Sequence, residues 1–239
     1  QEIMTDVMSL PSAFTLDNIK NVFHDMKYPA TFLNTLIATV IGTLGIIVIA
    51  SMGGYKMARV KTRYSRFCFL FCIAPMMIPF QSFMLTLVNV ATTLHINGKI
   101  WGLAIIYWGL GAPMSIFLYQ GFAKGIPLEL EESALIDGCN QFQLFTRIIF
   151  PMLKSCTATV TIINVMWIWN DFLLPLLMLG GRKSSKTLQL AAYSFMGQYK
   201  MEWQNIMSAA ILIIIPALIL YLIFQNCIIK GVVAGAVKG

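Results

Sequence analysis

The sequence predicts an all-α protein, a polytopic transmembrane bundle of helices. Hydrophobic residues make up 58% of its 239 positions, above the roughly 45–50% that is usual for globular domains. The mean hydropathy is +0.75. Five apolar stretches are long enough to cross the hydrocarbon core of a bilayer, which takes about 20 residues as a helix. Together these observations predict a single membrane domain over residues 1–239.

The five expected spans follow one another along the chain, and the last four contain proline. We place them near residues 32–54, 67–89, 100–121, 158–180 and 206–229. Span 67–89 contains Pro75 and Pro79, and span 100–121 contains Pro113. Span 158–180 contains Pro175, and span 206–229 contains Pro216. Such breakers are tolerated at membrane depth where neighbouring helices or a water-filled cavity satisfy the freed backbone groups. This pattern favours a bundle that forms a pathway over a simple anchor.

The Lys and Arg residues of the loops predict the orientation. Loop 55–66 carries five basic residues and no acid, namely Lys56, Arg59, Lys61, Arg63 and Arg66. Because basic loops stay in the cytoplasm, we expect this loop, loop 122–157 and the C-terminal tail there. Segments 1–31, 90–99 and 181–205 are then expected outside. Since the chain opens with a polar outer segment, we also expect a sixth span on its N-terminal side.

Composition argues against several classes of function. The formal charge of +7 is spread over the loops, which gives no support to nucleic-acid binding. None of the five cysteines falls in a C-x-x-C array and only two histidines are present, so no metal site is expected. The run GGRKSSK at 180–186 lacks the spacing of a nucleotide-binding P-loop, and no catalytic motif is present. We therefore expect a chain that is not an enzyme and that binds no cofactor itself.

One loop is unusual for a membrane protein, because it is amphipathic and rich in acids. Residues 130–154 read LEESALIDGCNQFQLFTRIIFPMLK. The acids are Glu131, Glu132 and Asp137. A helix is predicted to begin at Pro127, where acids suit the helix dipole, and to stop at Gly138. A second helix is predicted from about Asn140 to Pro151. Two short helices joined by a bend would present a surface to a partner, and a helix that lies on the lipid is the open alternative.

The same loop closely resembles the EAA loop of ABC importer permeases. The family pattern is E-A-A, three residues, Gly, nine residues and I-x-L-P. Glu132-Ser133-Ala134, Gly138 and Ile148-Ile149-Phe150-Pro151 match it at the same spacing, with Ser133 and Phe150 as the two departures. The stretches FLYQGFAKGIPLELEESALIDG, WNDFLLPL and GAVKG resemble the carbohydrate-uptake branch, and specifically the maltose-type second permease subunit. The resemblance covers nearly all of residues 8–239.

This resemblance implies a bundle of the type I ABC importer kind in a bacterial cell membrane. It implies a sister permease, two cytoplasmic ATPase subunits that hold ATP and Mg²⁺, and an extracytoplasmic sugar-binding protein. The cargo would be a carbohydrate, either an oligosaccharide or a glycoside. The loop would couple to the ATPase, with Glu132 as polar anchor, Ala134 as a close-packing position and Gly138 as the bend. The expected coupling residues are Glu131, Glu132, Ser133, Ala134, Asp137, Gly138, Ile148 and Pro151. A secondary transporter or channel without an ATPase is the alternative reading.

Polar residues within spans predict the pathway, because they are costly in a membrane and usually functional. Asn170 and Asp171 in WIWNDFLLPL could bond to a hydroxyl-rich substrate, and Trp167 or Trp169 could stack on it. Further candidates are Gln81 and Tyr107. The alternative is that Asp171 caps a broken helix or pairs with a sister permease. A threonine stripe on the first span is better explained by helix packing, and its members are Thr31, Thr35, Thr39 and Thr43.

Overall fold

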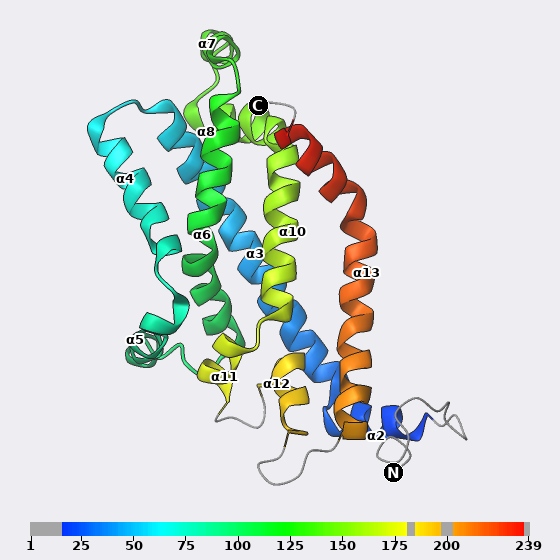
Figure 1. The fold of residues 1–239 in the computed structure, drawn as a ribbon. Coiled ribbons are helices and arrows are strands. Elements are labelled where there is room, and N and C mark those ends of the chain that lie inside the picture. Colours follow the sequence, from blue (N-terminus) through cyan, green and yellow to red (C-terminus); the bar gives the residue numbers. More distant parts are fainter. Residues whose placement is uncertain (1–15, 181–184, 197–202, 237–239) are drawn as a thin grey trace.

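A computed structural model describes residues 16–180, 185–196 and 203–236 of the protein, and these ranges contain helices and no strands. Long helices extend between the two ends of the bundle (Figure 1). They are α3 (Tyr28–Arg59), α6 (Ile100–Lys124), α10 (Lys154–Asn170) and α13 (Trp203–Ala236). The predicted all-α class is confirmed for the described ranges. The expected outer loop 181–205 and the C-terminal tail lie partly outside them.

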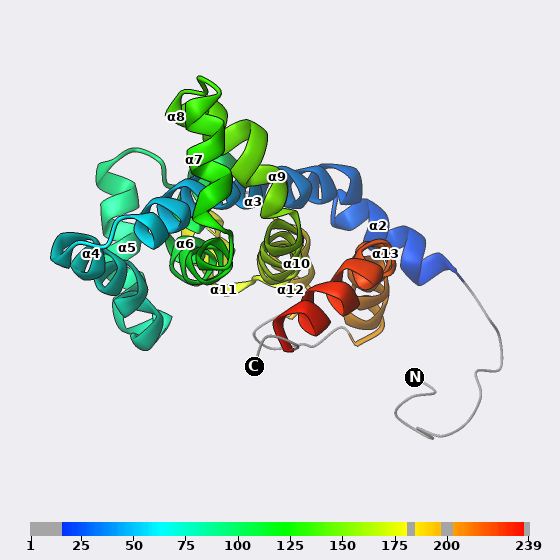
Figure 2. The same ribbon diagram turned by 90° about the horizontal axis from the view of Figure 1, so that it is seen from above.

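Shorter helices occupy the two ends of the bundle. One end, called the loop end below, carries α7 (Leu128–Ile136), α8 (Gln141–Gln143), the π-helix η2 (Leu144–Ile149) and α9 (Phe150–Met152) (Figure 1). The opposite end carries α2 (Asp17–Asp25), α5 (Phe80–Thr93), α11 (Leu173–Leu179) and α12 (Leu188–Tyr193). Helix α4 (Arg63–Ile73) and the 3₁₀ turn η1 (Ala74–Met77) run between the ends at one side of the bundle (Figure 2).

Helices α3 and α6 pack closely because glycines let their backbones approach. A Cβ added at Gly54 would lie 2.7 Å from the Cβ of Tyr119 and 3.0 Å from backbone atoms of α6. Gly45 lies against the indole of Trp108, whose Nε1 donates to the carbonyl oxygen of Ile41 at 2.9 Å. Small residues at such contacts are typical of membrane helices, where close packing replaces the hydrophobic effect as a driving force.

The threonine stripe of α3 faces the interior of the chain. All four side chains are buried. Thr35 Oγ1 donates to the carbonyl of Thr31 at 2.9 Å and accepts from the backbone N–H of Leu188 at 2.9 Å, so it fastens α12 to α3. The stripe therefore lies in the packed interior of the described chain, where Thr35 joins α12 to α3.

Two of the expected spans are not single helices. By length and composition α3 and α6 could cross a membrane, and the described residues allow up to four spans if each of two bent pairs counts as one. The expected span 67–89 is one of the bent pairs, with an angle of 107° between Arg63–Met77 and Phe80–Thr93. The cause is Pro79, which disfavours helical angles at the residue before it, and Ile78 is extended at φ −98°, ψ 121°. The number of five spans stays a prediction.

The expected span 158–180 contains a break, because α10 ends at Asn170 and α11 begins at Leu173. Asp171 is extended at φ −71°, ψ 132°. Its Oδ1 accepts from the backbone N–H of Leu173 at 3.1 Å, which satisfies one of the backbone donors that have no partner within the first turn of α11. At its other end α10 meets the preceding segment Gln141–Met152 at a bend of 75°.

The close approach of α3 and α6 can be tested with two adjacent glycines of the same helix. Gly54→Ala should lower the free energy of unfolding of the purified protein by about 1–3 kcal/mol, because the added methyl group overpacks the contact with Tyr119. The melting temperature should fall accordingly. Gly53→Ala is the matched control, since a Cβ there meets no atom within 4 Å. Thermal denaturation in detergent measures both, and equal stability of the two variants would contradict the packing described here.

Candidate functional site

Helix α7 ends in a glycine turn that reverses the chain. Gly138 has a φ of +87°, in the left-handed region that glycine adopts without strain. The backbone N–H of Cys139 donates to the carbonyl of Ala134 at 3.0 Å, and that of Gly138 donates to Leu135 at 3.1 Å. These are the two hydrogen bonds of a Schellman motif. The helix stop predicted at Gly138 is confirmed.

The second helical segment begins in a capping box immediately after this turn. Asn140 Oδ1 accepts from the backbone N–H of Gln143 at 2.9 Å, and Gln143 Oε1 accepts from that of Asn140 at 3.1 Å. The box satisfies two backbone donors that have no partner within the helix. Ile149 is buried, Ile148 is partly buried, and Pro151 is exposed in the first turn of α9. The predicted segment from Asn140 to Pro151 is helical as expected, with a π-helical middle.

Glu131 on α7 is directed into the bundle. Its residue is 8% exposed. Tyr55 Oη donates to Glu131 Oε2 at 2.8 Å, and Arg59 Nε donates to Oε1 at 2.5 Å. The same guanidinium donates to the carbonyl oxygen of Ile126 at 2.9 Å. The carboxylate that the sequence grouped with partner-facing residues therefore has its partners within the chain, in what we call the Glu131 cluster (Tyr55, Arg59, Glu131).

The opposite side of α7 is open. Glu132 and Asp137 are exposed, as is Ser133, whose hydroxyl donates to the carbonyl of Glu129 at 2.8 Å. Ala134 is buried beside the Glu131 cluster on the inner side. Large apolar side chains are exposed together with the acids, and Ile136 reaches 86%. We call the outer face the α7 surface, made by Leu128, Glu132, Leu135, Ile136, Asp137 and Phe142.

The α7 surface has the composition of a docking site. Apolar side chains gathered on an exposed surface usually mark a contact with a protein or a membrane. Here they stand beside carboxylates on a helix that projects beyond the bundle (Figure 1). Lipid contact would favour basic rather than acidic neighbours, since the polar faces of interfacial helices are rich in Lys and Arg. A partner with apolar and basic side chains fits this surface better.

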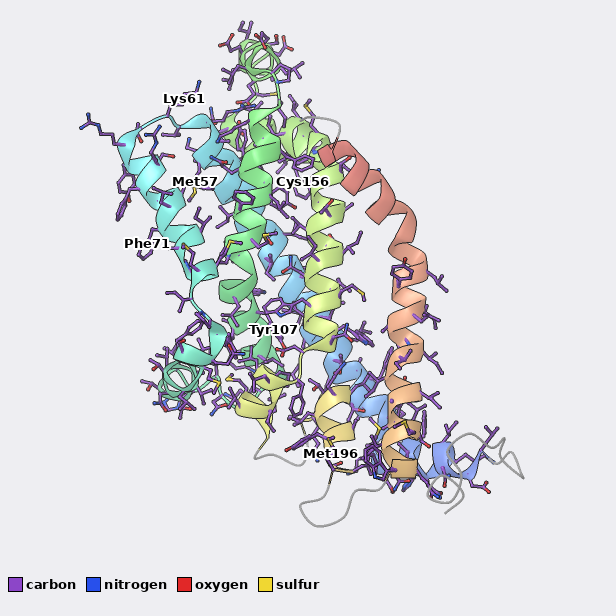
Figure 3. The ribbon with its side chains drawn as sticks, in the orientation of Figure 1. Met57, Lys61, Phe71, Tyr107, Cys156 and Met196 are labelled. Carbon is purple, nitrogen blue, oxygen red and sulfur yellow. The ribbon has the colours of Figure 1, made fainter. Side chains whose placement is uncertain are left out.

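Three of the predicted pathway residues meet near the opposite end of the bundle. Tyr107 Oη donates to Asp171 Oδ2 at 2.7 Å, and Tyr107 is 1% exposed. Trp167 stands edge-on to the ring of Tyr107, with centroids 5.4 Å apart and an interplanar angle of 79°. Tyr107 is on α6, and its ring contacts Trp167 of the neighbouring α10 (Figure 3). With both carboxylate oxygens engaged, Asp171 braces the break between α10 and α11.

The other three candidates lie elsewhere. Asn170 is exposed, and its amide donates to the carbonyl of Met166 at 2.8 Å. Trp169 is 1% exposed and packs edge-on against Phe32 at 5.7 Å. Gln81 is exposed on α5. Among the aromatic candidates, the 40% exposed Trp167 is therefore the one with an open face.

The sequence reading missed a second buried polar contact between spans. Asn164 Nδ2 donates to Ser115 Oγ at 3.1 Å and to the carbonyl of Val160 at 2.8 Å. Both residues are buried, and Ser115 Oγ donates in turn to the carbonyl of Gly111 at 2.8 Å. An asparagine in an apolar span was the available signal. The described residues contain no group of three His, Cys, Asp or Glu side chains placed to hold a metal ion.

The fold and the loop together define a permease of an ABC importer, and comparison with known proteins places the chain in that class. Residues 45–233 match the family described as "Binding-protein-dependent transport system inner membrane component". The match covers well over half of the chain, so the chain belongs to this family. Its family and its apolar helices make it a multi-pass membrane protein.

Individual relatives extend along nearly the whole chain. The probable starch degradation products transport system permease protein AmyC of Thermoanaerobacterium thermosulfurigenes is 39% identical over 237 residues, which are 99% of this chain and 86% of the relative. The multiple sugar-binding transport system permease protein MsmG of Streptococcus mutans serotype c is 37% identical, over 100% and 86% of the two chains. A solved bacterial ABC transporter involved in the import of alginate shares the fold. Its TM-score is 0.76 at 22% identity, over 91% of this chain and 81% of that one.

The two adjacent glutamates should respond differently to truncation. Glu131→Ala leaves Arg59 unpaired where the side chain is 13% exposed, and loss of one partner of a buried pair costs about 3–5 kcal/mol. Amide hydrogen exchange in α7 should therefore accelerate at least about tenfold. Glu132→Ala, one residue away and exposed, is the control and should leave exchange unchanged. The inward position of Glu131 would be disproved by equal exchange in the two variants.

Proposed function

We propose that the chain is a permease subunit of an ATP-driven importer for a carbohydrate, either an oligosaccharide or a glycoside. The observation that carries the proposal is the α7 surface, which stands at the EAA spacing and rests on the Glu131 cluster. Two of the relatives described above are named as transport permeases for starch degradation products and for multiple sugars. A third, MelC of Bacillus subtilis, is 31% identical and is named a melibiose, raffinose and stachyose import permease.

The proposed assembly contains a sister permease, two ATPase subunits and an extracytoplasmic sugar-binding protein. ATP and Mg²⁺ belong to the ATPase subunits, and this chain contributes neither nucleotide binding nor catalysis. The loop end and the C-terminus lie in the cytoplasm in this proposal. The basic loop 55–66 supports the orientation, because it stands at the same end as α7 (Figure 1) and basic loops remain on the cytoplasmic side.

Coupling in this proposal is mechanical. The ATPase receives the apolar and acidic residues of the α7 surface, with Glu132 as the outward carboxylate. When the ATPase pair closes on ATP, α7 moves with it. Because the Glu131 cluster ties α7 to the end of α3, and glycine contacts hold α3 against α6, the displacement passes to the long helices. The pathway then opens to the outside by alternating access.

Within the pathway, we assign the substrate-facing role to Trp167. Its ring is partly open and is steadied by Tyr107, which is held in turn by Asp171. A flat apolar ring with an open face suits the C–H face of a sugar. Asp171 acts as a brace in this assignment, and Asn170, Trp169 and Gln81 have no part in it.

The alternative is a secondary transporter or channel that works without an ATPase. Such a protein has no ATPase partner to contact a projecting helix with apolar and acidic side chains. The α7 surface therefore argues against this alternative. The complex purified through this chain and reconstituted in liposomes separates the two. Uptake that requires ATP on the cytoplasmic side supports the importer, and uptake without ATP supports the alternative.

Coupling can be tested with a pair of variants at the bend. Gly138→Val should abolish stimulation of ATPase turnover by substrate and binding protein. A β-branched residue at φ +87° carries a strain of about 1–3 kcal/mol and displaces the α7 surface. Gly138→Asn is the matched control, since asparagine tolerates the left-handed region and a Cβ there meets no atom within 4 Å. Stimulated ATPase activity of the reconstituted transporter is the measurement.

A second substitution on the α7 surface tests whether the ATPase contacts Glu132. Glu132→Lys reverses an exposed charge and should likewise uncouple ATPase turnover from transport, while the protein still inserts in the membrane. Wild-type coupling in both Gly138→Val and Glu132→Lys would refute the proposed role of the loop.

The pathway assignment predicts a modest loss on removal of the open ring. Trp167→Ala should weaken the apparent affinity for the transported sugar about 2- to 10-fold, since an aromatic contact contributes about 0.5–1.5 kcal/mol. Trp167→Phe keeps a ring and should recover most of the affinity. Concentration-dependent uptake of labelled sugar measures both variants. Unchanged uptake in Trp167→Ala would remove this residue from the pathway.

A further inference from the structure

A basic cleft lies at the loop end, between the end of α3, the start of α4 and the connection from α6 to α7. Its volume is about 1000 Å³. Five cations and one carboxylate line it, namely Arg59, Lys61, Arg63, Arg66, Lys124 and Glu129. We call this space the basic cleft. The excess of positive charge is unusual in a chain with only 11% charged residues.

Most of these cations have no acidic partner. Within the described residues the ion pairs are His24–Asp25 and Arg59–Glu131. The side chains at positions 61, 63, 66 and 124 therefore face the cleft without a carboxylate at ion-pair distance. Like charges held close together repel one another, so an anion between them would be stabilised.

The backbone adds to the positive potential. Helix α4 begins at Arg63, beside the cleft, and Thr62 caps it by accepting from the N–H of Ser65 at 3.1 Å. The N-terminus of a helix carries a partial positive charge and free N–H groups that favour an anion. Helix dipole and side chains therefore act in the same direction.

A glutamine amide also lines the cleft. Gln120 on α6 is 8% exposed. Its amide atoms are not among the buried polar atoms without a partner, so they are open to the cleft, where water or a polar ligand can hydrogen-bond to them.

Part of the lining of the basic cleft is apolar. Phe69 and Leu70 line it, and Leu70 is 54% exposed. Phe67 and Phe71 extend the apolar face of α4, with ring centroids 6.2 Å apart. Lys61 stands at the end of the bundle and Phe71 lies further along α4 (Figure 3). A free phosphate ion makes no favourable contact with these apolar side chains. A phospholipid has both a phosphate for the cations and acyl chains for the apolar face.

We propose that the basic cleft binds the phosphate headgroup of an anionic phospholipid, with the acyl chains along the exposed face of α4. Basic pockets between helices on the cytoplasmic side of a membrane suit such headgroups. The headgroup would contact the connection around Pro127 and Glu129, which leads directly into α7. The charge of the membrane would thereby act on the position of the α7 surface.

The test compares lipid retention by the transporter complex purified through this chain. The complex is stripped of lipid in detergent and titrated with phosphatidylglycerol or phosphatidylcholine, and native mass spectrometry measures the lipid retained. Wild type should retain phosphatidylglycerol selectively. The triple variant Lys61→Gln, Arg63→Gln and Arg66→Gln should weaken its binding by about 5-fold per removed cation. All three side chains are exposed. If the triple variant fails to assemble, the double variant Lys61→Gln and Lys124→Gln replaces it in the same measurement of lipid binding.

The matched control removes the same charge from the same end of the bundle. Lys56, Arg147 and Lys154 are exposed and lie outside the basic cleft. Changing these three to Gln should leave phosphatidylglycerol binding at the wild-type level. Equal losses in the two triple variants would overturn the proposal in favour of diffuse surface charge.

Two further arms separate other occupants. Inorganic phosphate at millimolar concentration should neither displace the lipid nor raise the melting temperature as phosphatidylglycerol does. Competition by phosphate alone would indicate a free-anion site and defeat the proposal. A photocrosslinker at position 61 should capture lipid, and capture of a protein subunit instead would show that an acidic partner covers the cleft. Neither arm depends on ATPase coupling, so the outcome is independent of the proposed transport function.

Discussion

The orientation of α7 depends on one buried ion pair, between Glu131 and Arg59. The two side chains are 11% and 13% exposed. Transfer of two charges out of water is costly, and good geometry with further hydrogen bonds is needed to offset it. Here the hydroxyl of Tyr55 and the carbonyl of Ile126 supply those bonds. Helix α7 cannot rotate without uncovering an unpaired charge, so the outward direction of Glu132 follows from the inward direction of its neighbour.

The ion pair is joined to the rest of the bundle through α3. This helix has 32 residues, which at 1.5 Å per residue make about 48 Å, more than the roughly 30 Å of a hydrocarbon core. Its last turn carries the basic residues Lys56 and Arg59, so under the proposed function this turn extends past the apolar layer, where Tyr55 and Arg59 hold α7 outside the membrane. In that arrangement the Glu131 cluster joins the spanning part of the protein to the part that the ATPase can reach.

Much of the loop could be predicted from the sequence, because its signals are local. A glycine stop, an asparagine start and acids in a first turn act over three or four residues, and the structure has the bend at Gly138 and the cap at Asn140. The direction of Glu131 was not predictable in this way. It depends on Arg59, 72 residues away. The sequence does not tell which of two adjacent glutamates faces the bundle until the packing of their helix is known.

The course of the apolar stretches could be predicted less well, for a different reason. Hydropathy records how long a stretch is and carries no information on its direction, so a helix pair bent by 107° resembled one span. Pro79 was visible in the sequence, but whether a proline kinks a helix slightly or divides it depends on what the second half can pack against. Asp171 is similar, because its contacts at the helix break involve both Leu173 and Tyr107. The sequence singles out a polar residue within a span, but Tyr107, its partner on another helix, is 64 residues away.

Two of the irregular joints lie at the end away from α7, at Ile78 and at Asp171 (Figure 1). Hydrocarbon offers no hydrogen bonds, so an interrupted helix in a membrane must satisfy its backbone within the protein or in water. The N–H of Ile78 donates to the carbonyl of Pro75 at 3.1 Å, and the carboxylate of Asp171 serves its own break. Under the proposed function, α3 and α6 transmit a displacement as stiff helices, and the backbone changes angle most easily at such joints. The joint at Asp171 lies beside Tyr107, whose ring contacts Trp167, so under the proposed function this movement occurs at the opposite end of the bundle from the α7 surface.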